Sequence, residues 1–191
     1  MSSESPSSPT RRRLLMAAPL VVAAGAGVGF WRMLSGMSHG SFDPHDIHAP
    51  VLNRPVPDFS LPDQAPGTGF SAQDLRGLKA PVLVNYFASW CIPCVAEMPV
   101  LNGLKDRLPI WGIAYKDKPE HALGFVQRAG NPYARIAADR DGLTAIDWGV
   151  SGVPETFLIG PGGVIRWHTA SPITEAMIAD TILPLAGSLK S

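Results

Sequence analysis

A predicted buried strand that runs into a closely spaced cysteine pair constrains this chain more than any other feature. The segment Val-Leu-Val-Asn-Tyr-Phe at 82–87 is apolar and rich in β-formers, as expected for a strand covered on both faces. Cys91 and Cys94, the only two cysteines in 191 residues, follow shortly after, and a helix-compatible stretch comes next. The pattern predicts a strand, a tight turn and a helix, with Cys91 at the helix N-terminus.

Cysteines in this position favour redox chemistry. The positive end of a helix macrodipole and its free N–H groups stabilise thiolate over thiol. A thiolate attacks disulfides, and a second thiol two residues further along can resolve the mixed disulfide that forms. The pair Cys91 and Cys94 is therefore predicted to form a reversible, redox-active disulfide that needs no other cofactor.

Two structural alternatives compete with this interpretation. A zinc site usually has four ligands, but no second cysteine pair exists and the five histidines are scattered. His121 and His168 are isolated, and we expect both to lie on the surface without a role. A purely structural disulfide would close too small a loop to add much stability. We predict no metal site.

The N-terminus predicts export. Residues 1–13 read as a disordered cytoplasmic end that closes on three arginines, and residues 14–34 as a transmembrane anchor. The uncharged stretch 14–31 would span roughly 27 Å as a helix. Cleavage after Ala26, or export by a twin-arginine signal, stays an alternative, and both would also export the domain.

A single soluble domain should follow the anchor. Residues 35–50 lack periodicity and are predicted to be a linker, which leaves 51–191 for one domain with a proper core. After Arg32 the chain carries 12 basic and 15 acidic residues, so no basic face suggests nucleic-acid binding.

Strand and helix signals alternate within this domain and predict a three-layer α/β fold. The expected strands are 82–87, 110–115, and a hairpin formed by 156–159 and 164–168. The expected helices are 94–107, 119–129, 142–148 and an amphipathic C-terminal helix at 174–185.

Several motifs together resemble a known family. The stretch Tyr-Phe-Ala-Ser-Trp-Cys-x-Pro-Cys is similar to the thioredoxin superfamily. Other segments narrow the resemblance to the CcmG/DsbE family, the membrane-tethered, TlpA-like thioredoxins of cytochrome c biogenesis. These are Arg-Pro-Val-Pro-Asp-Phe-Ser-Leu-Pro at 54–62, Gly-Ile-Ala-Tyr-Lys-Asp at 112–117, Gly-Asn-Pro-Tyr at 130–133, Ala-Ile-Asp-Trp-Gly at 145–149 and Gly-Val-Pro-Glu-Thr-Phe at 152–157.

The resemblance implies a thioredoxin-like fold with a central mixed sheet, and a thiol-disulfide oxidoreductase. It implies a monomer, anchored in the inner membrane by a single pass, with its domain in the periplasm. There the protein would reduce the disulfide of apocytochrome c CxxCH sites, or of a thiol chaperone, before haem attachment. A CcdA/DsbD-like transmembrane thiol donor would restore its own thiols.

Four residues in and beside the turn that carries the cysteines have predicted roles. Cys91, the first residue of the turn and the more exposed thiol, is the expected nucleophile, and Cys94 the buried resolving thiol. Pro93 occupies an early helical position, where its missing N–H costs nothing. Trp90 is expected to cover the disulfide and to contact partners, and the alternative is an ordinary core tryptophan.

Val153 and Pro154 match the cis-proline loop of the superfamily, which faces the cysteines. A cis bond there would let Val153 pair with an extended substrate peptide by β-type hydrogen bonds. Tyr115, at the carboxyl end of a predicted strand, is a further candidate for partner binding, and a plain polar strand exit is the alternative.

Acidic side chains near the thiols would tune them and relay protons. Thioredoxin has a buried aspartate six residues before its nucleophile, but this chain has Asn85 there. Glu97 and Glu155, which match acidic positions of the family, are the predicted replacements. A solvated helix residue and an exposed loop carboxylate are the respective alternatives.

Other functions remain open from the sequence. A broader TlpA-like reductase with other exported targets would use the same chemistry. A thiol peroxidase normally has a Pro-x-x-x-Thr-x-x-Cys context, and neither Pro nor Thr stands at those positions before Cys91. A redox-silent module that binds the apoprotein around Trp90 and Pro154 is a third class.

Overall fold

The computed structural model of the 191-residue chain describes residues 19, 22–32, 35, 51–65 and 67–189. The chain divides into two units, residues 1–46 and 47–191. In the first unit, residues 22–32 are helical and exposed. Nowhere in the described residues does a helix have the length and apolar character needed to cross a membrane. The predicted N-terminus 1–13, most of the linker 35–50 and parts of the anchor 14–34 lie outside the described residues, so the predicted transmembrane helix is not confirmed.

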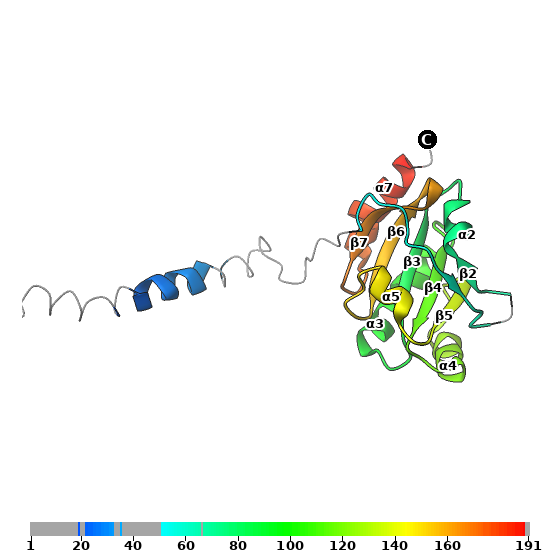
Figure 1. The fold of residues 1–191 in the computed structure, drawn as a ribbon, viewed down its shortest axis with the longest axis horizontal. Coiled ribbons are helices and arrows are strands. Elements are labelled where there is room, and N and C mark those ends of the chain that lie inside the picture. The colour runs from blue at the N-terminus through cyan, green and yellow to red at the C-terminus, as the bar shows by residue number, and fades with distance from the viewer. Residues whose placement is uncertain (1–18, 20–21, 33–34, 36–50, 66, 190–191) are drawn as a thin grey trace, which may run out of the picture. The chain divides into compact units, whose positions relative to one another are not determined.

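Five strands form the central sheet of the second unit, in the order β5-β4-β3-β6-β7 (Figure 1). Strands β3, β4 and β5 run parallel, whereas β6 and β7 are antiparallel to their neighbours. The sheet is therefore mixed, as predicted. The strands are β3 (Val82–Phe87), β4 (Ile110–Tyr115), β5 (Arg135–Asp139), β6 (Glu155–Gly160) and β7 (Val164–Thr169).

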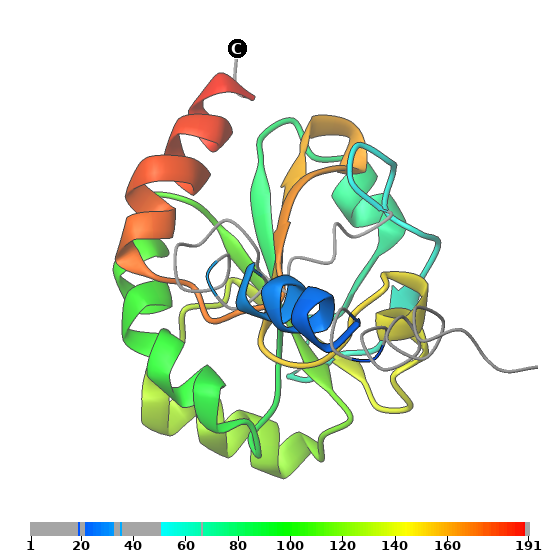
Figure 2. The ribbon, with the colours of Figure 1, turned by 90° about the vertical axis from the view of Figure 1, so that its left-hand side faces the viewer.

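Helices cover both faces of this sheet (Figure 2). Alternate strand residues serve the two sides: Leu83 and Phe87 join one core, and Val84 and Tyr86 the other. The predicted three-layer α/β fold is confirmed. The first core includes residues of α3 (Ile92–Leu104), α4 (Pro119–Ala129) and a C-terminal helical segment, and the second includes residues of α2 (Ala72–Arg76) and α5 (Leu143–Asp147).

Two predicted helices differ from the observed ones at proline residues. Helix α3 begins at Ile92, two residues earlier than predicted, because Cys91 caps it and Pro93 fits its first turn. The C-terminal segment consists of α6 (Glu175–Met177), a π-helical turn η2 (Ile178–Ile182) and α7 (Leu183–Ser188). Pro184 in the first turn of α7 has no N–H to donate back to the preceding turn, which favours the wider π-helical turn there.

The turn between β6 and β7 requires glycine at two positions. A short 3₁₀ turn, η1 (Pro161–Gly163), joins the strands, and Gly162 and Gly163 have φ angles of 74° and 76°. Residues that carry a Cβ rarely adopt such backbone angles, so glycine is the favoured residue at both positions. A Cβ on Gly163 would also lie 2.7 Å from the side chain of Arg76. The predicted hairpin is confirmed, with this turn at its tip.

Several short elements near the sheet edge were not predicted. They are β1 (Ser60–Leu61), β2 (Phe70–Ser71), α2 and the edge strand β5. Helix α2 begins with a capping box between Ser71 and Asp74, a sequence signal that could have revealed it. Strand β5 has the sequence Arg-Ile-Ala-Ala-Asp, whose two alanines give little strand signal.

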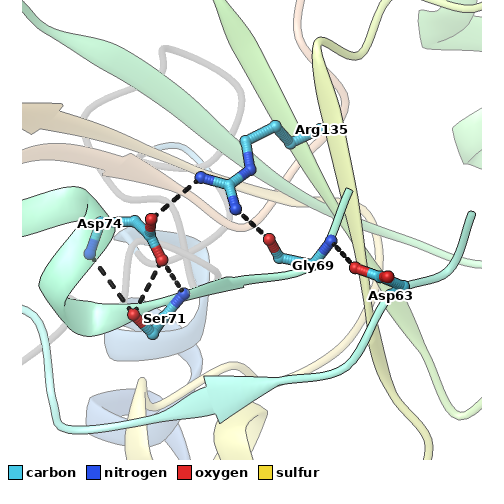
Figure 3. A network of polar contacts seen from close by, with 5 residues as sticks. All are labelled: Asp63, Gly69, Ser71, Asp74 and Arg135. Atoms are coloured by element: carbon cyan, nitrogen blue, oxygen red, sulfur yellow. Dashed lines mark hydrogen bonds and ion pairs between the residues drawn. The ribbon is translucent and has the colours of Figure 1, made fainter. Parts of the chain in front are cut away.

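A polar network ties these elements together (Figure 3). Arg135 of β5 forms an ion pair with Asp74 of α2 (Nη1 to Oδ1, 3.1 Å) and donates to the carbonyl of Gly69. The N–H of Gly69 in turn donates to Asp63. The guanidinium of Arg135 also lies over the Trp111 ring, 4.8 Å from its centroid. The network therefore attaches the β1–β2 hairpin and α2 to the sheet edge.

Candidate active site

The two cysteines form a disulfide at the N-terminus of α3. Their sulfurs are 2.05 Å apart and their Cα atoms 5.3 Å apart. Cys91 is the N-cap residue, and its Sγ accepts a hydrogen bond from the backbone N–H of Cys94 at 3.1 Å. This N–H also lies where it can stabilise a thiolate on Cys91. Cys91 is 4% exposed and Cys94 0%, so Cys91 is the more accessible sulfur by only a narrow margin.

Exposed apolar side chains surround the disulfide. Trp90 is 57% exposed, which excludes the alternative of a core tryptophan. Its ring centroid lies 6.4 Å from that of Tyr115, and its Nε1 donates to the Lys116 carbonyl at 3.4 Å. Pro93 is exposed in the first turn of α3. Sequence reasoning did not single out Ile92 and Val95 of α3, which adjoin the two cysteines in the chain and are also exposed.

A buried carboxylate holds the turn that precedes Cys91. Asp117 accepts from the backbone N–H of Ser89 at 2.6 Å and from its hydroxyl at 2.9 Å. It also accepts from the backbone N–H of Lys118 at 2.8 Å. Asp117, just after the carboxyl end of β4, therefore holds the turn that leads to the disulfide.

The segment before β6 contributes the loop predicted to face the cysteines. The Val153–Pro154 peptide bond is cis, as predicted. Pro154 is buried, and Val153 is partly exposed. Val153 packs against both hydrophobic cores, including the one that contains Cys91 and Cys94. The structure thus brings Val153 to the cluster around the disulfide.

Glu97 lies one turn beyond Cys94 on α3 and is only 1% exposed, which excludes the solvated alternative. Its Oε1 accepts from Asn85 Nδ2 at 3.0 Å, and its Oε2 from the backbone N–H of Ile173 at 3.0 Å. Burial raises the pKa of Glu97 from 4.5 to about 7, although both hydrogen bonds act to lower it. Residues three apart share a helix face, so a carboxyl group able to gain or lose a proton near neutral pH accompanies the resolving thiol.

Asn85 organises the polar groups around Glu97. Besides Glu97, its side chain donates to Thr156 Oγ1 at 2.9 Å and accepts from the Tyr133 hydroxyl at 2.7 Å. Burial raises the pKa of Tyr133 well above its ordinary value, with the Glu97 charge adding to the shift. Residue 85 is therefore an amide where thioredoxin has a carboxylate. In this chain the Asn85 amide is hydrogen-bonded to a carboxylate from α3, that of Glu97.

Glu155 is the second buried carboxylate, also 1% exposed, which excludes the exposed-loop alternative. Its Oε2 accepts from the backbone N–H groups of Ser151 at 2.9 Å and Gly152 at 3.4 Å, and from the Ser151 hydroxyl at 3.3 Å. Its Oε1 is within hydrogen-bonding distance of Nε2 of His168. The prediction that His168 is a surface residue is wrong, because its side chain is only 7% exposed. His121 is exposed, as predicted.

The two carboxylates serve opposite faces of the sheet. Thr156, the hydrogen-bonding neighbour of Asn85, precedes Phe157, which belongs to the core of α2 and α5 together with Tyr86. Glu155 and Phe157 project to the same face because strand side chains alternate. Glu97, by contrast, belongs to the helix on the other face, the face that holds Cys91 and Cys94.

The described residues contain no group of three or more His, Cys, Asp or Glu side chains arranged to hold a metal ion.

Comparison with known proteins places this site in a context. Residues 52–168 match the model of the AhpC/TSA family. The thiol:disulfide interchange protein HelX of Rhodobacter capsulatus is 40% identical over 173 residues, which are 90% of this chain and 94% of HelX. DsbE of Xylella fastidiosa strain Temecula1, which bears the same description, is 39% identical over 153 residues, 78% of this chain and 77% of that protein. The crystal structure of a protein assigned as DsbE from Chlorobium tepidum superposes with a TM-score of 0.58 at 26% identity, covering 69% of this chain and 94% of that one.

Proposed function

Because this chain belongs to the DsbE/HelX (CcmG) family and has its thioredoxin-like fold, we propose that it reduces protein disulfides during cytochrome c maturation. The observation that carries the proposal is the Cys91–Cys94 disulfide at the N-terminus of α3, with Glu97 one turn further along. Thiol-disulfide exchange needs a stabilised thiolate, a resolving thiol and a proton acceptor. All three are present on one helix.

The reaction begins from the reduced protein. The Cys91 thiolate attacks one sulfur of the partner disulfide, a Cys91–partner bond forms, and the partner's own sulfur–sulfur bond breaks. The released partner thiolate takes up a proton. Cys94 then passes its proton to the Glu97 carboxylate, and its thiolate attacks Cys91 Sγ. The Cys91–partner bond breaks, and the second partner sulfur leaves as a thiolate that takes up a proton. The protein ends as the Cys91–Cys94 disulfide, and two electrons have passed to the partner.

Glu97 suits the second step because its pKa is raised to about 7. A general base is most effective when its pKa lies near the working pH. Glu155 shares no sheet face with the cysteines, and its oxygens contact His168 and the 151–152 backbone. We therefore assign proton transfer to Glu97 and the support of the Val153–Pro154 loop to Glu155.

The surface around the disulfide suits an extended peptide. The backbone of Val153 would pair with the peptide by β-type hydrogen bonds, next to the cis bond to Pro154. Exposed Trp90, Pro93 and half-buried Tyr115 would contact its side chains. The disulfide itself is buried, so a partner must fit closely around the turn to bring its sulfur to Cys91.

The proposed setting follows from the family. The partner is apocytochrome c at its CxxCH site, or a thiol chaperone that carries it, and a CcdA/DsbD-like membrane protein returns the electrons. Residues 1–13 would remain in the cytoplasm, 14–34 would anchor the chain in the inner membrane, and 35–50 would link the anchor to a monomeric periplasmic domain at 51–191. The periplasm is kept oxidising, so a dedicated reductant there meets the need of haem attachment for free thiols.

A peptide competition tests the substrate class. Reduced full-length protein is mixed with an oxidised CxxCH peptide and with a scrambled peptide that keeps only the CxxC disulfide. Acid quenching and mass spectrometry then follow both thiol products. We expect the CxxCH peptide to be reduced about tenfold faster, which corresponds to about 1.4 kcal/mol of selective binding.

The other outcomes separate the alternatives. Equal rates for the two peptides would favour a general TlpA-like reductase. Binding of the peptide without reduction, unchanged when Cys91 and Cys94 are both replaced by serine, would favour the redox-silent binding module. Faster oxidation of the reduced protein by hydrogen peroxide than by either peptide would favour a thiol peroxidase.

A further inference from the structure

His168, which is partly buried, contacts the carboxylate oxygen of Glu155 that does not accept from the loop before β6. His168 lies on β7, beside β6, and its Nε2 pairs with Glu155 Oε1 while Oε2 of the same carboxylate accepts from the loop. The two side chains are 7% and 1% exposed. Nothing in the chemistry of the cysteines requires this pair, because it lies on the opposite face of the sheet.

The ring of His168 is itself fixed by packing. Its centroid lies 4.5 Å from that of Phe157, its register partner on β6. Phe157 contacts Trp148 edge-on, with 5.0 Å between the centroids, and both are fully buried. The buried rings of Phe157 and Trp148 therefore fix the imidazole of His168 next to Glu155.

Glu155 connects His168 to the loop at 151–154. Its Oε2 receives N–H groups from Ser151 and Gly152, and the residue itself follows Pro154 directly, so the carboxylate closes a short loop on itself. A carboxylate at 1% exposure needs hydrogen-bond partners for both oxygens. Without His168, Oε1 would have no partner among these contacts, and the carboxylate would turn towards solvent. That movement releases the N–H groups of the loop, which donate to Oε2.

We propose that His168 is a positioning residue for partner binding: through Glu155 it holds the 151–154 loop so that the Val153 backbone can receive an extended peptide. The inference rests on the proposed function and deepens it, because it assigns a binding role to a residue far from the thiols in sequence. It predicts that His168 affects the capture of peptide disulfides and leaves the thiol chemistry unchanged.

The test compares two substrates and two variants of the full-length protein. His168→Leu removes the donor to Glu155, whereas His168→Gln places an amide N–H near the position of Nε2. The substrates are an oxidised CxxCH peptide and a small aromatic disulfide that is too short to pair with Val153. His121→Leu, at an exposed histidine, is the matched control.

We expect His168→Leu to raise KM for the peptide about tenfold, the effect of losing about one well-placed hydrogen bond, with kcat changed less than about twofold. His168→Gln should recover most of that loss, and His121→Leu should match the wild type. The rate with the small disulfide should be the same in all four proteins. Amide hydrogen exchange at Ser151 and Gly152 should be faster in His168→Leu and close to normal in His168→Gln.

Three outcomes would overturn the inference. One is an unchanged peptide KM in a folded His168→Leu protein. Another is an equal loss of rate with both substrates, which would indicate a general structural role. The third is equal exchange at Ser151 and Gly152 in both variants. A wild-type protein that reduces neither substrate would instead contradict the proposed function, so the two failures are distinguishable.

Discussion

Glu97 and Glu155 are equally buried, yet their surroundings differ in kind. Glu97 has only neutral partners, the Asn85 amide and one backbone N–H, and its pKa is raised to about 7. Glu155 contacts the imidazole of His168 on the adjacent strand as well as two backbone N–H groups of the preceding loop. Burial among neutral groups raises the pKa of Glu97, whereas the contacts of Glu155 connect the 151–152 loop to strand β7.

The difference is the basis for the separate roles that we propose for the two carboxylates around one disulfide. Glu97 shares a helix with Cys94, and in the proposed function it exchanges a proton with Cys94 during turnover. Glu155 holds the loop that carries Val153 and Pro154. Sequence alone makes them look like a pair, because both are acidic and both adjoin an active-site motif. They can be distinguished by perturbing one at a time.

The largest expected effect is on stability when Glu155 is truncated. Glu155→Ala leaves the buried His168 and the N–H groups of Ser151 and Gly152 without their acceptor. Removing one partner of a buried pair costs about 3–5 kcal/mol, which urea unfolding of the full-length protein can measure. Glu120→Ala, at an exposed helix position, is the control and should change stability by about 0.5 kcal/mol or less. A loss as small as the control's would mean that the Glu155 contacts do not hold the loop.

The pH dependence of stability should report Glu97. Its folded pKa of about 7 lies above its unfolded value of 4.5, so between these values the folded state binds more protons than the unfolded state. Stability from this group is therefore fully present below pH 4.5 and is lost as the pH rises to about 7, by about 3 kcal/mol in total.

Replacing Glu97 should remove that dependence. In Glu97→Gln the free energy of unfolding should no longer fall over this pH range because of residue 97. The amide faces donors from Asn85 and Ile173, so one donor–donor contact lowers stability by a similar amount at every pH. Urea unfolding at several pH values tests this. An undiminished fall in the variant would show that another group causes it.

A somewhat smaller effect is expected on turnover. Glu97→Gln should slow the resolving attack of Cys94 by about a hundredfold, the lower range for losing a general base. It should also abolish the rise of that rate through about pH 7. Rapid-quench measurement of mixed-disulfide decay follows the step directly. Glu155→Gln is the informative partner variant and should keep the rise. The same loss of pH dependence in both variants would contradict the separation of roles.

The strands that were predicted have a strong hydrophobic pattern in their own sequence, and the strands that were missed do not. Strands β3 and β4 were predicted residue for residue, because buried parallel strands read as continuous apolar runs. Strand β5 was missed because it lies at the sheet edge and has two alanines. The β1–β2 hairpin was missed because two-residue strands carry no periodicity.

The site divides in the same way. The Cys91–Cys94 pair follows from a short motif and the cis bond before Pro154 from the family resemblance, and the structure bears out the disulfide and the cis bond. The roles predicted for Trp90, Pro93, Val153, Tyr115 and the two glutamates remain predictions. His168 could not be found from its neighbours in sequence, because its partner lies 13 residues away on the adjacent strand. Register between antiparallel strands decides that contact, and no local pattern records it.

A trapping experiment in native membranes can identify the physiological partner of Cys91. In full-length Cys94→Ser the resolving thiol is absent, so a mixed disulfide on Cys91 should persist and mass spectrometry can identify its partner. The account predicts apocytochrome c or its thiol chaperone, bound at Cys91 and absent from a Cys91→Ser control. A folded, exported protein that traps no partner would contradict it.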